Sequence, residues 1–170
     1  MGRTVKPHPP APAPGRRGGV REPDPAAFAD SRPLFGIDTM LFVYHFEGNP
    51  EFGAAAGRVL AAAEGGRCRL VASALALMEV LVIPKRLGAD DLCRKYHEFF
   101  RYFPGLTVVP VDEAVAEVAA DLRARHAIRT PDAIHLATAI RAGAQAFLTQ
   151  DLALRRAKEI PVKTLESFRG

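Results

Sequence analysis

The chain has 170 residues, a length that fits one domain and leaves little room for two. Its hydrophobic content of 48% and charged content of 25% are ordinary for a globular protein. No apolar run approaches the roughly 20 residues that cross a bilayer, and no hydrophobic segment follows the basic residues near the N-terminus as it would in a secretory signal. The composition therefore argues against a membrane span and against secretion, and we expect a cytoplasmic protein.

The formal net charge of +4 is modest and unevenly placed. Residues 1–33 hold six basic and three acidic side chains, which leaves 17 basic and 16 acidic side chains for the rest of the chain. A nearly neutral body argues against binding nucleic acid by charge alone, although it allows a local basic surface. The only cysteines, Cys68 and Cys93, lack the spacing of a zinc site or a redox pair and indicate free thiols.

The opening segment, residues 1–33, contains eight of the 14 prolines and almost no aliphatic clusters. Proline removes backbone donors, and so little apolar area cannot offset the entropy of ordering. We therefore predict a disordered tail here, although a misassigned start codon would also account for the segment. The folded domain is expected over residues 34–168.

From residue 34 onward the apolar pattern alternates between short strands and helices. In chain order, the expected elements are a strand at 34–37, a helix to about Phe46, a helix at 51–64, a strand at 69–73, a helix at 74–83 stopped by Pro84, a helix at 89–102, a strand at 106–111, helices at 113–127 and 131–142, a strand at 146–149, a short helix at 152–158 and a strand at 162–165. Short strands that are apolar throughout and alternate with helices predict an α/β fold. Its parallel five-stranded sheet would be flanked by helices as an α/β/α sandwich.

Three aspartates follow the strands or open a helix. In a parallel sheet the functional crevice lies beyond the carboxyl ends of the strands, where Asp38 follows the first strand and Asp151 the fourth. Asp132 falls in the first turn of a helix for which Thr130 is the expected N-cap and Pro131 the first helical residue. Each aspartate taken singly also has a purely structural explanation, since an acid at a helix start caps free N–H groups.

Glu79 is the single polar side chain within "ALALMEVLVI", residues 74–83. A helix this apolar is expected to be buried nearly all round. An ionised carboxylate buried without a partner costs several kcal/mol, so Glu79 must have a cation, a basic residue or a solvent-filled cleft beside it. A buried ion pair with Arg129 or Arg86 would satisfy this need without any catalytic function.

Together, these four acids predict a metal site. Carboxylates that converge on one pocket raise each other's pKa unless a counter-charge relieves them. A hard divalent cation with oxygen ligands provides that charge, and magnesium binds through carboxylates while keeping several waters. The chain offers no histidine-plus-cysteine set that would favour zinc.

Four segments of the chain resemble PIN domains, and most of all the VapC-type toxin ribonucleases of bacterial toxin–antitoxin pairs. They occur in the family order with family-like spacing, and the resemblance covers about 34–168: "GIDTMLFVYHF" (36–46), "SALALMEVLVIP" (73–84), "RTPDAIHLATAI" (129–140) and "FLTQDLAL" (147–154). By position, Asp38, Glu79, Asp132 and Asp151 match the family's metal-binding acidic quartet. Thr39 and Thr149 match positions where the family usually has a small hydroxyl residue that supports the site.

The resemblance implies a Mg²⁺- or Mn²⁺-dependent ribonuclease that hydrolyses phosphodiester bonds in RNA. It also implies a homodimer and a small antitoxin protein that blocks the cleft. As a hypothesis, one or two cations activate a water, and Asp132 or Asp151 orients or deprotonates it. Basic side chains would hold the RNA backbone. The best candidates are Arg155 and Arg156 after the last acid, ahead of Lys85, Arg86, Arg94, Lys95, Arg101 and Lys158.

Two further features have both a structural and a functional explanation. His135, one turn past Asp132, is a candidate metal ligand or acid, but a lone histidine on an apolar helix is more often a packed core residue. The aromatic stripe of Tyr96, Phe99, Phe100 and Phe103 would stack bases or, as helical spacing favours, form a core or dimer-interface face.

Two rival functions come from other classes. One is a PIN-fold RNA-binding module that cuts nothing, which an assay for divalent-dependent RNA cleavage would distinguish. The other is a receiver-like phosphoacceptor domain, which needs paired acids after the first strand and a lysine after the last, and which does not account for Glu79. No Gly-rich phosphate loop and no GxSxG elbow is present.

Overall fold

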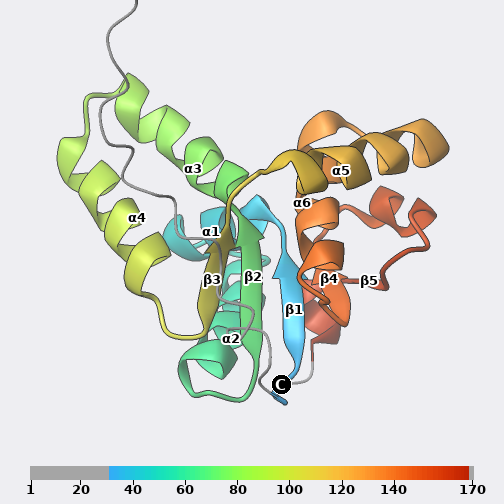
Figure 1. Cartoon of the computed structure of the whole chain (residues 1–170). Helices are drawn as coiled ribbons and strands as arrows, with labels where there is room; N and C mark the ends of the chain where they lie inside the picture. Colours follow the sequence, from blue (N-terminus) through green and yellow to red (C-terminus); the bar gives the residue numbers. More distant parts are fainter. Residues whose placement is uncertain (1–30, 169–170) are drawn as a thin grey trace, which may run out of the picture.

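A parallel sheet forms the centre of the computed structural model, which describes residues 31–168 (Figure 1). Within these residues its strand order is β3-β2-β1-β4-β5, with every neighbouring pair parallel. The strands are β1 Leu34–Ile37, β2 Arg69–Ser73, β3 Leu106–Val109, β4 Ala146–Leu148 and β5 Val162–Lys163. The predicted five-stranded parallel sheet is therefore confirmed.

The predicted helices are also present, most of them within one or two residues of the expected bounds. They are α1 Thr39–Phe46, α2 Gly53–Glu64, α3 Ala74–Arg86, α4 Asp90–Tyr102, α5 Glu113–His126, α6 Thr130–Arg141, and the 3-10 turns η2 Leu152–Arg156 and η3 Leu165–Ser167. The predicted disordered tail falls mainly on residues 1–30, which lie outside the described residues. None of the helices in 31–168 has the length and apolar character to span a membrane.

Two apolar cores lie on opposite faces of the sheet. Phe147 and Leu148 are neighbours on β4, and their side chains must point to opposite faces because side chains alternate along a strand. Phe147 belongs to the core formed with α5 and α6, whereas Leu148 belongs to the core formed with α1, α2, α3 and α4. In Figure 1, α3 and α4 accordingly stand on one side of the strands and α5 and α6 on the other.

The predicted aromatic stripe packs into the core formed with α1, α2, α3 and α4. The ring of Phe42 on α1 lies 4.5 Å from that of Phe100, and the ring of Phe46 lies 4.7 Å from that of Tyr96. Phe99 stacks on Phe103 at 4.5 Å. The stripe therefore joins α4 to α1, as its helical spacing favours. Cys68 and Cys93 are buried free thiols, as predicted.

Helix α3 differs from its prediction in two respects. Pro84 does not stop it, because the proline lies in the last turn, where its missing N–H removes a single helical hydrogen bond. The helix ends at Arg86, shortly before Gly88 takes the left-handed φ of +65° that terminates helices. Nor is α3 buried all round, since Met78 and Ile83 are 51% and 59% exposed.

Gly36 on β1 allows helix α6 to approach the sheet closely. A Cβ at this position would lie 2.2 Å from Cβ of Ala139 and 2.9 Å from Cδ2 of Phe147. No real carbon pair tolerates such distances, so any side chain here would push α6 away from β1. The spacing between the end of β1 and the start of α6 depends on this glycine.

Replacing Gly36 with alanine should lower the free energy of unfolding by about 1–3 kcal/mol, because the added methyl overpacks the contact with Ala139. Urea unfolding followed by circular dichroism measures the change. Gly57→Ala is the matched control, since the same methyl group inside α2 meets only Nδ1 of His45 at 3.9 Å. That variant should gain about 0.5–1 kcal/mol from helix propensity, and equal effects of the two substitutions would contradict the packing argument.

Candidate functional site

The candidate site lies where the direction of the chain through the sheet reverses. From β1 the chain builds β2 and β3 on one side, and it then returns to β4 on the other side. Such a switch point leaves a crevice at the carboxyl ends of the strands. The backbone N–H of Asp38 still donates to the carbonyl of Leu148 at 3.1 Å, so β1 and β4 stay together up to the first residue of the site.

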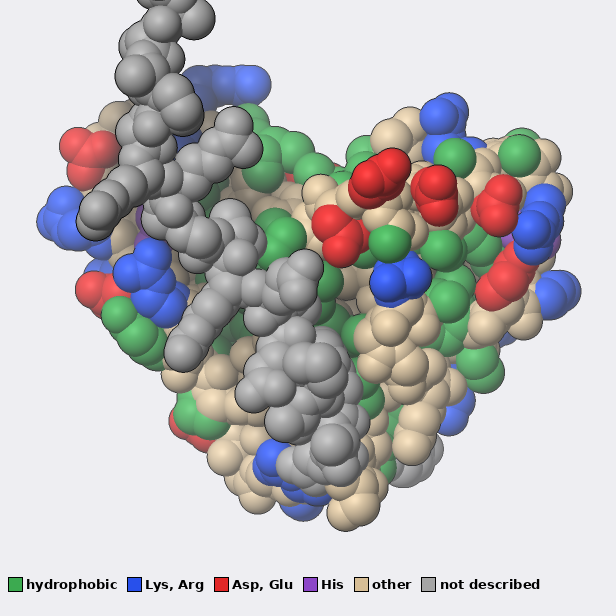
Figure 2. All heavy atoms as spheres, in the orientation of Figure 1, with side chains coloured by type: hydrophobic (Ala, Val, Ile, Leu, Met, Phe, Trp, Pro, Cys, Tyr) green, Lys and Arg blue, Asp and Glu red, His purple; other side chains and the backbone are tan. Residues whose placement is uncertain are grey.

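A pocket of about 490 Å³ occupies this edge. The space-filling view shows the molecule hollowed at its upper edge, between the part that carries α3 and α4 and the part that carries α5 and α6 (Figure 2). The lining side chains come from α1, α3, α6 and the segments beside them and after β4: Asp38, Thr39, Met40, Val43, Tyr44, Glu79, Arg129, Asp132, His135, Thr149, Gln150 and Asp151. All four predicted acids and both predicted hydroxyl residues therefore line one pocket, although their functional roles remain predictions.

Asp38 does not cap the free N–H groups of helix α1 with its side chain, as a purely structural role would require. It occupies the N-cap position of α1, but its side chain accepts no hydrogen bond from the helix. Its Oδ2 instead accepts the hydroxyl of Thr149 at 2.6 Å, across 111 residues of sequence. The carboxylate is thus turned from the helix N–H groups toward the pocket. A capping role does not explain this acid.

Asp151 caps η2 and lines the pocket as well. Its Oδ1 accepts the N–H of Ala153 at 2.9 Å, so the capping explanation holds for one oxygen. Its own N–H donates to Oγ1 of Thr149 at 3.0 Å. Thr149, only 2% exposed, therefore connects the two aspartates through a single hydroxyl. That connection fixes how far Asp38 and Asp151 lie from one another.

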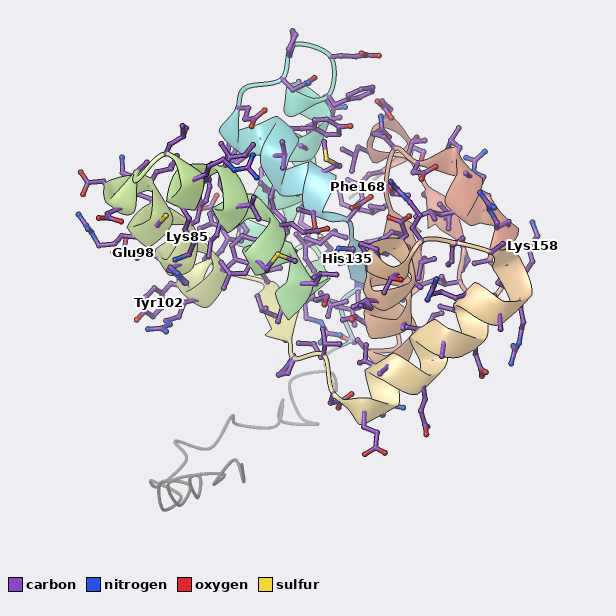
Figure 3. The ribbon with its side chains drawn as sticks, turned by 90° about the horizontal axis from the view of Figure 1, so that it is seen from above. Lys85, Glu98, Tyr102, His135, Lys158 and Phe168 are labelled. Carbon is purple, nitrogen blue, oxygen red and sulfur yellow. The ribbon has the colours of Figure 1, made fainter. Side chains whose placement is uncertain are left out.

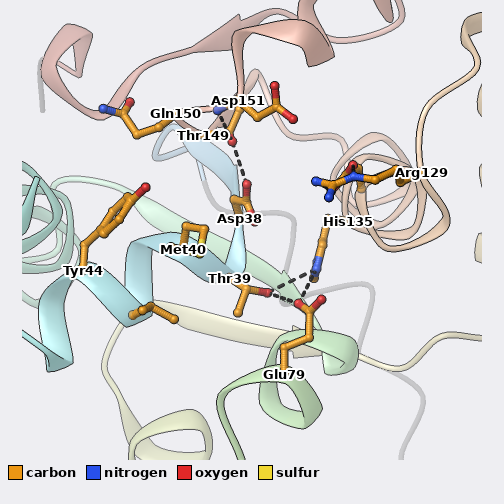
Figure 4. Close-up of a pocket in the computed structure, with 12 residues that line it drawn as sticks. Asp38, Thr39, Met40, Tyr44, Glu79, Arg129, His135, Thr149, Gln150 and Asp151 are labelled. Carbon is orange, nitrogen blue, oxygen red and sulfur yellow. Dashed lines mark hydrogen bonds and ion pairs between the residues drawn. The ribbon is translucent and has the colours of Figure 1, made fainter. Parts of the chain in front are cut away.

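Glu79 is held by a hydroxyl and an imidazole (Figure 4). Its Oε2 accepts a hydrogen bond from Oγ1 of Thr39 and lies 3.0 Å from Nε2 of His135. These bonds, that of His135 above all, hold the pKa of the Glu79 carboxyl below its ordinary value against the opposing effect of burial. The partner is therefore a histidine. The arginine ion pair that was the alternative is absent among the described residues, because Arg129 acts on Glu79 only through its more distant charge.

His135 is a packed residue that also lines the pocket, and its role as a metal ligand or acid remains a prediction. It is packed in the protein at 3% exposure, and it lines the pocket with Nε2 directed at Glu79 and Thr39. Seen from above, it lies near the centre of the molecule between the two groups of helices (Figure 3). Its spacing of three residues from Asp132 on α6 was the signal for this position, because residues three apart share a helix face.

Asp132 lies in the first turn of α6 and is paired with Arg129. Nε of Arg129 donates to Oδ2 at 2.9 Å and Nη2 to Oδ1 at 3.4 Å. The predicted N-cap, Thr130, is wrong by one residue. Arg129 takes the N-cap position in extended geometry, and α6 already begins at Thr130, so Pro131 is the second helical residue and still lies in the first turn, where its missing N–H costs no helical bond.

Met40 and Tyr44 also line the pocket, although no sequence pattern singles them out. They follow Asp38 on the first turns of α1 and form the wall opposite α6. Burial raises the pKa of the Tyr44 hydroxyl, with a further contribution from the charge of Asp38. Met40 and Tyr44 lie four residues apart and share a face of α1, but this spacing alone does not distinguish them from the other apolar residues of the helix.

The predicted RNA-binding pair lies elsewhere. Arg155 and Arg156 are exposed on η2 and are not among the residues that line the pocket. Arg156 donates to the carbonyls of Ala153 and His126. Lys158, two residues further on, is at the outer edge of the molecule in the view from above (Figure 3). Contact with RNA at this pair remains a prediction.

The donor set fits a hard divalent cation. Within the described residues, Asp38, Glu79 and Asp151 each use one carboxylate oxygen in hydrogen bonds and leave the other without one. Free carboxylate oxygens suit Mg²⁺ or Mn²⁺. Asp132 differs, because Arg129 engages both its oxygens. Across residues 31–168, no three acidic, histidine or cysteine side chains are already gathered closely enough to form a finished metal site.

A family model for the PIN domain matches residues 36–160, well over half of the chain and all four acids. The chain belongs to the PIN domain family. This assignment removes the receiver-like alternative. No curated protein sequence matches the chain.

Solved structures share this PIN domain fold. VapBC2 from Rickettsia felis, bound to a DNA fragment, has a TM-score of 0.62 at 14% identity over 77% of this chain and 98% of that one. DNA-bound VapBC from Salmonella typhimurium has a TM-score of 0.60 at 19% identity, covering 79% and 98%. A toxin–antitoxin complex from Klebsiella pneumoniae has a TM-score of 0.57 at 23% identity, covering 78% and 97%. At such identities the likeness establishes the fold.

The ionised state of Glu79 in this PIN domain can be tested through stability. A carboxyl whose pKa is lowered on folding stabilises the folded state fully above its unfolded pKa, and this contribution is lost as pH falls through the folded pKa. Below about pH 4.5, the free energy of unfolding of the wild type should therefore fall more steeply than that of Glu79→Gln. Urea unfolding at several pH values measures both curves. Parallel curves would show that the bonds to His135 and Thr39 do not favour the anion.

Proposed function

We propose that this PIN domain is a metal-dependent endoribonuclease that hydrolyses phosphodiester bonds of RNA. The observation that carries the proposal is the convergence of four carboxylates in one pocket at the switch point of the sheet: Asp38, Glu79, Asp132 and Asp151. They come from four separate segments of the chain, so sequence proximity does not explain their meeting. Clustered carboxylates destabilise the folded state, and such clusters are typical of functional sites.

The three acids with a free oxygen would hold Mg²⁺ or Mn²⁺, and Asp132 would join them when it leaves Arg129. The bound cation supplies positive charge that polarises the scissile phosphate and lowers the pKa of an attacking water. Thr149 fixes the carboxylate of Asp38, and Thr39 with His135 fixes that of Glu79. Such outer partners orient metal-binding side chains. The second oxygen of Asp151, which the cap of η2 leaves free, would either coordinate the cation or accept a proton from the water, but not both at once.

The biological setting that we propose is that of a toxin in a toxin–antitoxin pair acting in the cytoplasm. One of the similar structures is a toxin–antitoxin complex, which supports a small antitoxin as partner. The proposed homodimer needs an apolar surface, and α3 offers one in its exposed Met78, Val82 and Ile83. The proposed domain bounds are 34–168, in agreement with the start of β1 at Leu34.

Replacing Asp38 with asparagine should reduce RNA cleavage at least about 100-fold, because the loss of a metal-binding charge exceeds the 10- to 100-fold effect of losing an outer partner. Thr149→Val should have that smaller effect. Purified variants are assayed with labelled RNA in Mg²⁺ or Mn²⁺, and with the matched DNA sequence. EDTA should stop the wild-type reaction, and added Mg²⁺ or Mn²⁺ should restore it.

Glu117→Gln is the control for this series. It removes an acid of the same charge from the exposed surface of α5, away from the pocket, and it should cleave like the wild type. Thermal melting of each variant separates loss of activity from loss of fold. Full activity of a folded Asp38→Asn variant would refute the metal assignment. A folded wild-type protein that cleaves no RNA in the presence of metal would favour the RNA-binding module that cuts nothing.

A further inference from the structure

Arg129 is a positively charged residue that lines the same pocket as the four acids. It is the one lysine or arginine among the described residues that line the pocket. In the close-up, its guanidinium points into the pocket from the side of α6 (Figure 4). Neither the sequence patterns nor the family likeness assigns it a function at the site.

The charge of Arg129 reaches all four carboxylates. The hydrogen bonds to Asp132 come first among the causes that raise the pKa of the guanidinium, followed by the charge of Asp132 and, more weakly, those of Asp151 and Asp38. The same guanidinium helps to lower the pKa of Glu79. The guanidinium of Arg129 therefore interacts electrostatically with all four carboxylates. Its direct partner is Asp132, the acid whose two oxygens both accept a hydrogen bond from it.

The backbone that carries Arg129 is held in place, whereas its side chain extends into solvent. Ile128, directly before it, is buried at 5% exposure, and the carbonyl of Arg129 accepts the N–H of Ala133 at 2.9 Å in the first turn of α6. The side chain, in contrast, is 78% exposed. Although the Asp132 side chain is only 15% exposed, the guanidinium lies in solvent, which screens the ion pair and lets the arginine exchange it for another partner. The guanidinium can therefore leave Asp132 while its base stays at the rim of the pocket.

A guanidinium suits an incoming phosphodiester. It presents five donors in a plane, of which the bonds to Asp132 use two. The rest match the oxygens of a phosphate, to which arginine binds through paired hydrogen bonds. If Asp132 coordinated a cation in the pocket, the guanidinium of Arg129 would be free to bind a phosphate of the RNA backbone.

We propose that Arg129 is an RNA-binding residue that exchanges anions: it neutralises Asp132 in the free protein and binds a phosphate of the RNA backbone once Asp132 has joined the metal. This inference rests on the proposed function and adds a residue to it. It gives Arg129 two opposite effects. The arginine competes with the metal for Asp132, and it assists the binding of RNA.

The test measures both effects in Arg129→Gln, which keeps hydrogen-bonding capacity but removes the charge. Calorimetric titration with Mn²⁺ alone, without RNA, should give an affinity about two- to fivefold higher than that of the wild type, because the competing charge of an exposed ion pair is gone. With an RNA that the wild type cleaves, the KM should rise about tenfold or more, because a charge-assisted bond to phosphate is lost. Arg129→Lys, which keeps a point charge, should restore part of the lower KM.

Arg125→Gln is the matched control. Arg125 is also an exposed arginine in an ion pair, with Asp121 at 3.2 Å, but it lies on α5 outside the pocket. Both its Mn²⁺ affinity and its KM should equal those of the wild type. A structural role of Arg129 would weaken metal and RNA binding together, so opposite changes distinguish the exchange from a loss of fold.

Two results would overturn the inference alone: an unchanged KM in Arg129→Gln while the wild type cleaves RNA, or a Mn²⁺ affinity that falls. A wild type that binds Mn²⁺ but cleaves no RNA under any condition would remove the proposed function, and the inference with it. The two failures are therefore distinguishable.

Discussion

The need to provide partners for four carboxylates that line one pocket is the constraint on which the site is built. Anionic groups gathered in one pocket are unfavourable unless each carboxylate has a hydrogen-bond donor or a counter-charge. The protein provides different partners for different acids: the hydroxyl of Thr149 for Asp38, an imidazole and a hydroxyl for Glu79, and the guanidinium of Arg129 for Asp132. Only the last partner carries a permanent charge. The pocket is thus neutralised in part and remains attractive to a cation.

The sheet determines where these acids meet. Parallel strands end at one edge, and the reversal between β1 and β4 opens that edge. The bond from Asp38 N–H to Leu148 keeps the two strand ends together, and Thr149 continues the connection through side chains. Helix α6 brings Asp132 and His135 from the opposite side, as close as Gly36 permits. Packing on both faces of the sheet therefore sets the geometry of the polar groups between them.

Much of this was predictable from the sequence, since apolar periodicity reports burial and burial sets the elements. The five strands, their helices and the order of the acids follow from local pattern. The end of α3 could not be predicted in this way. Pro84 indicates that one helical hydrogen bond is missing, but it does not determine whether the helix continues for another turn. The exposed face of α3 was also missed, since apolar composition does not tell which side chains a neighbouring element covers.

The partners of the acids were harder to predict than the acids themselves. Glu79 needed a partner, and the sequence offered arginines, but His135 bonds to it across 56 residues. Such pairings depend on how α3 and α6 pack, which no local pattern records. Tyr44 and Met40 were missed for the same reason, since nothing in their own neighbourhood is unusual. Strand ends, the burial of Glu79 and then the family's motif order all pointed to the acids, whereas the pairing of Arg129 with Asp132 required the structure.

The contact at Gly36 also limits how this chain can change over evolutionary time. Because the missing Cβ of Gly36 and the Cβ of Ala139 occupy nearly the same space, with the ring of Phe147 close behind, the two positions compete for the volume of one methyl group. A residue larger than glycine at 36 calls for glycine at 139, and the reverse pairing is the one found here. Relatives that keep α6 at this depth should therefore vary at 36 and 139 in concert, while the acids above them stay in place.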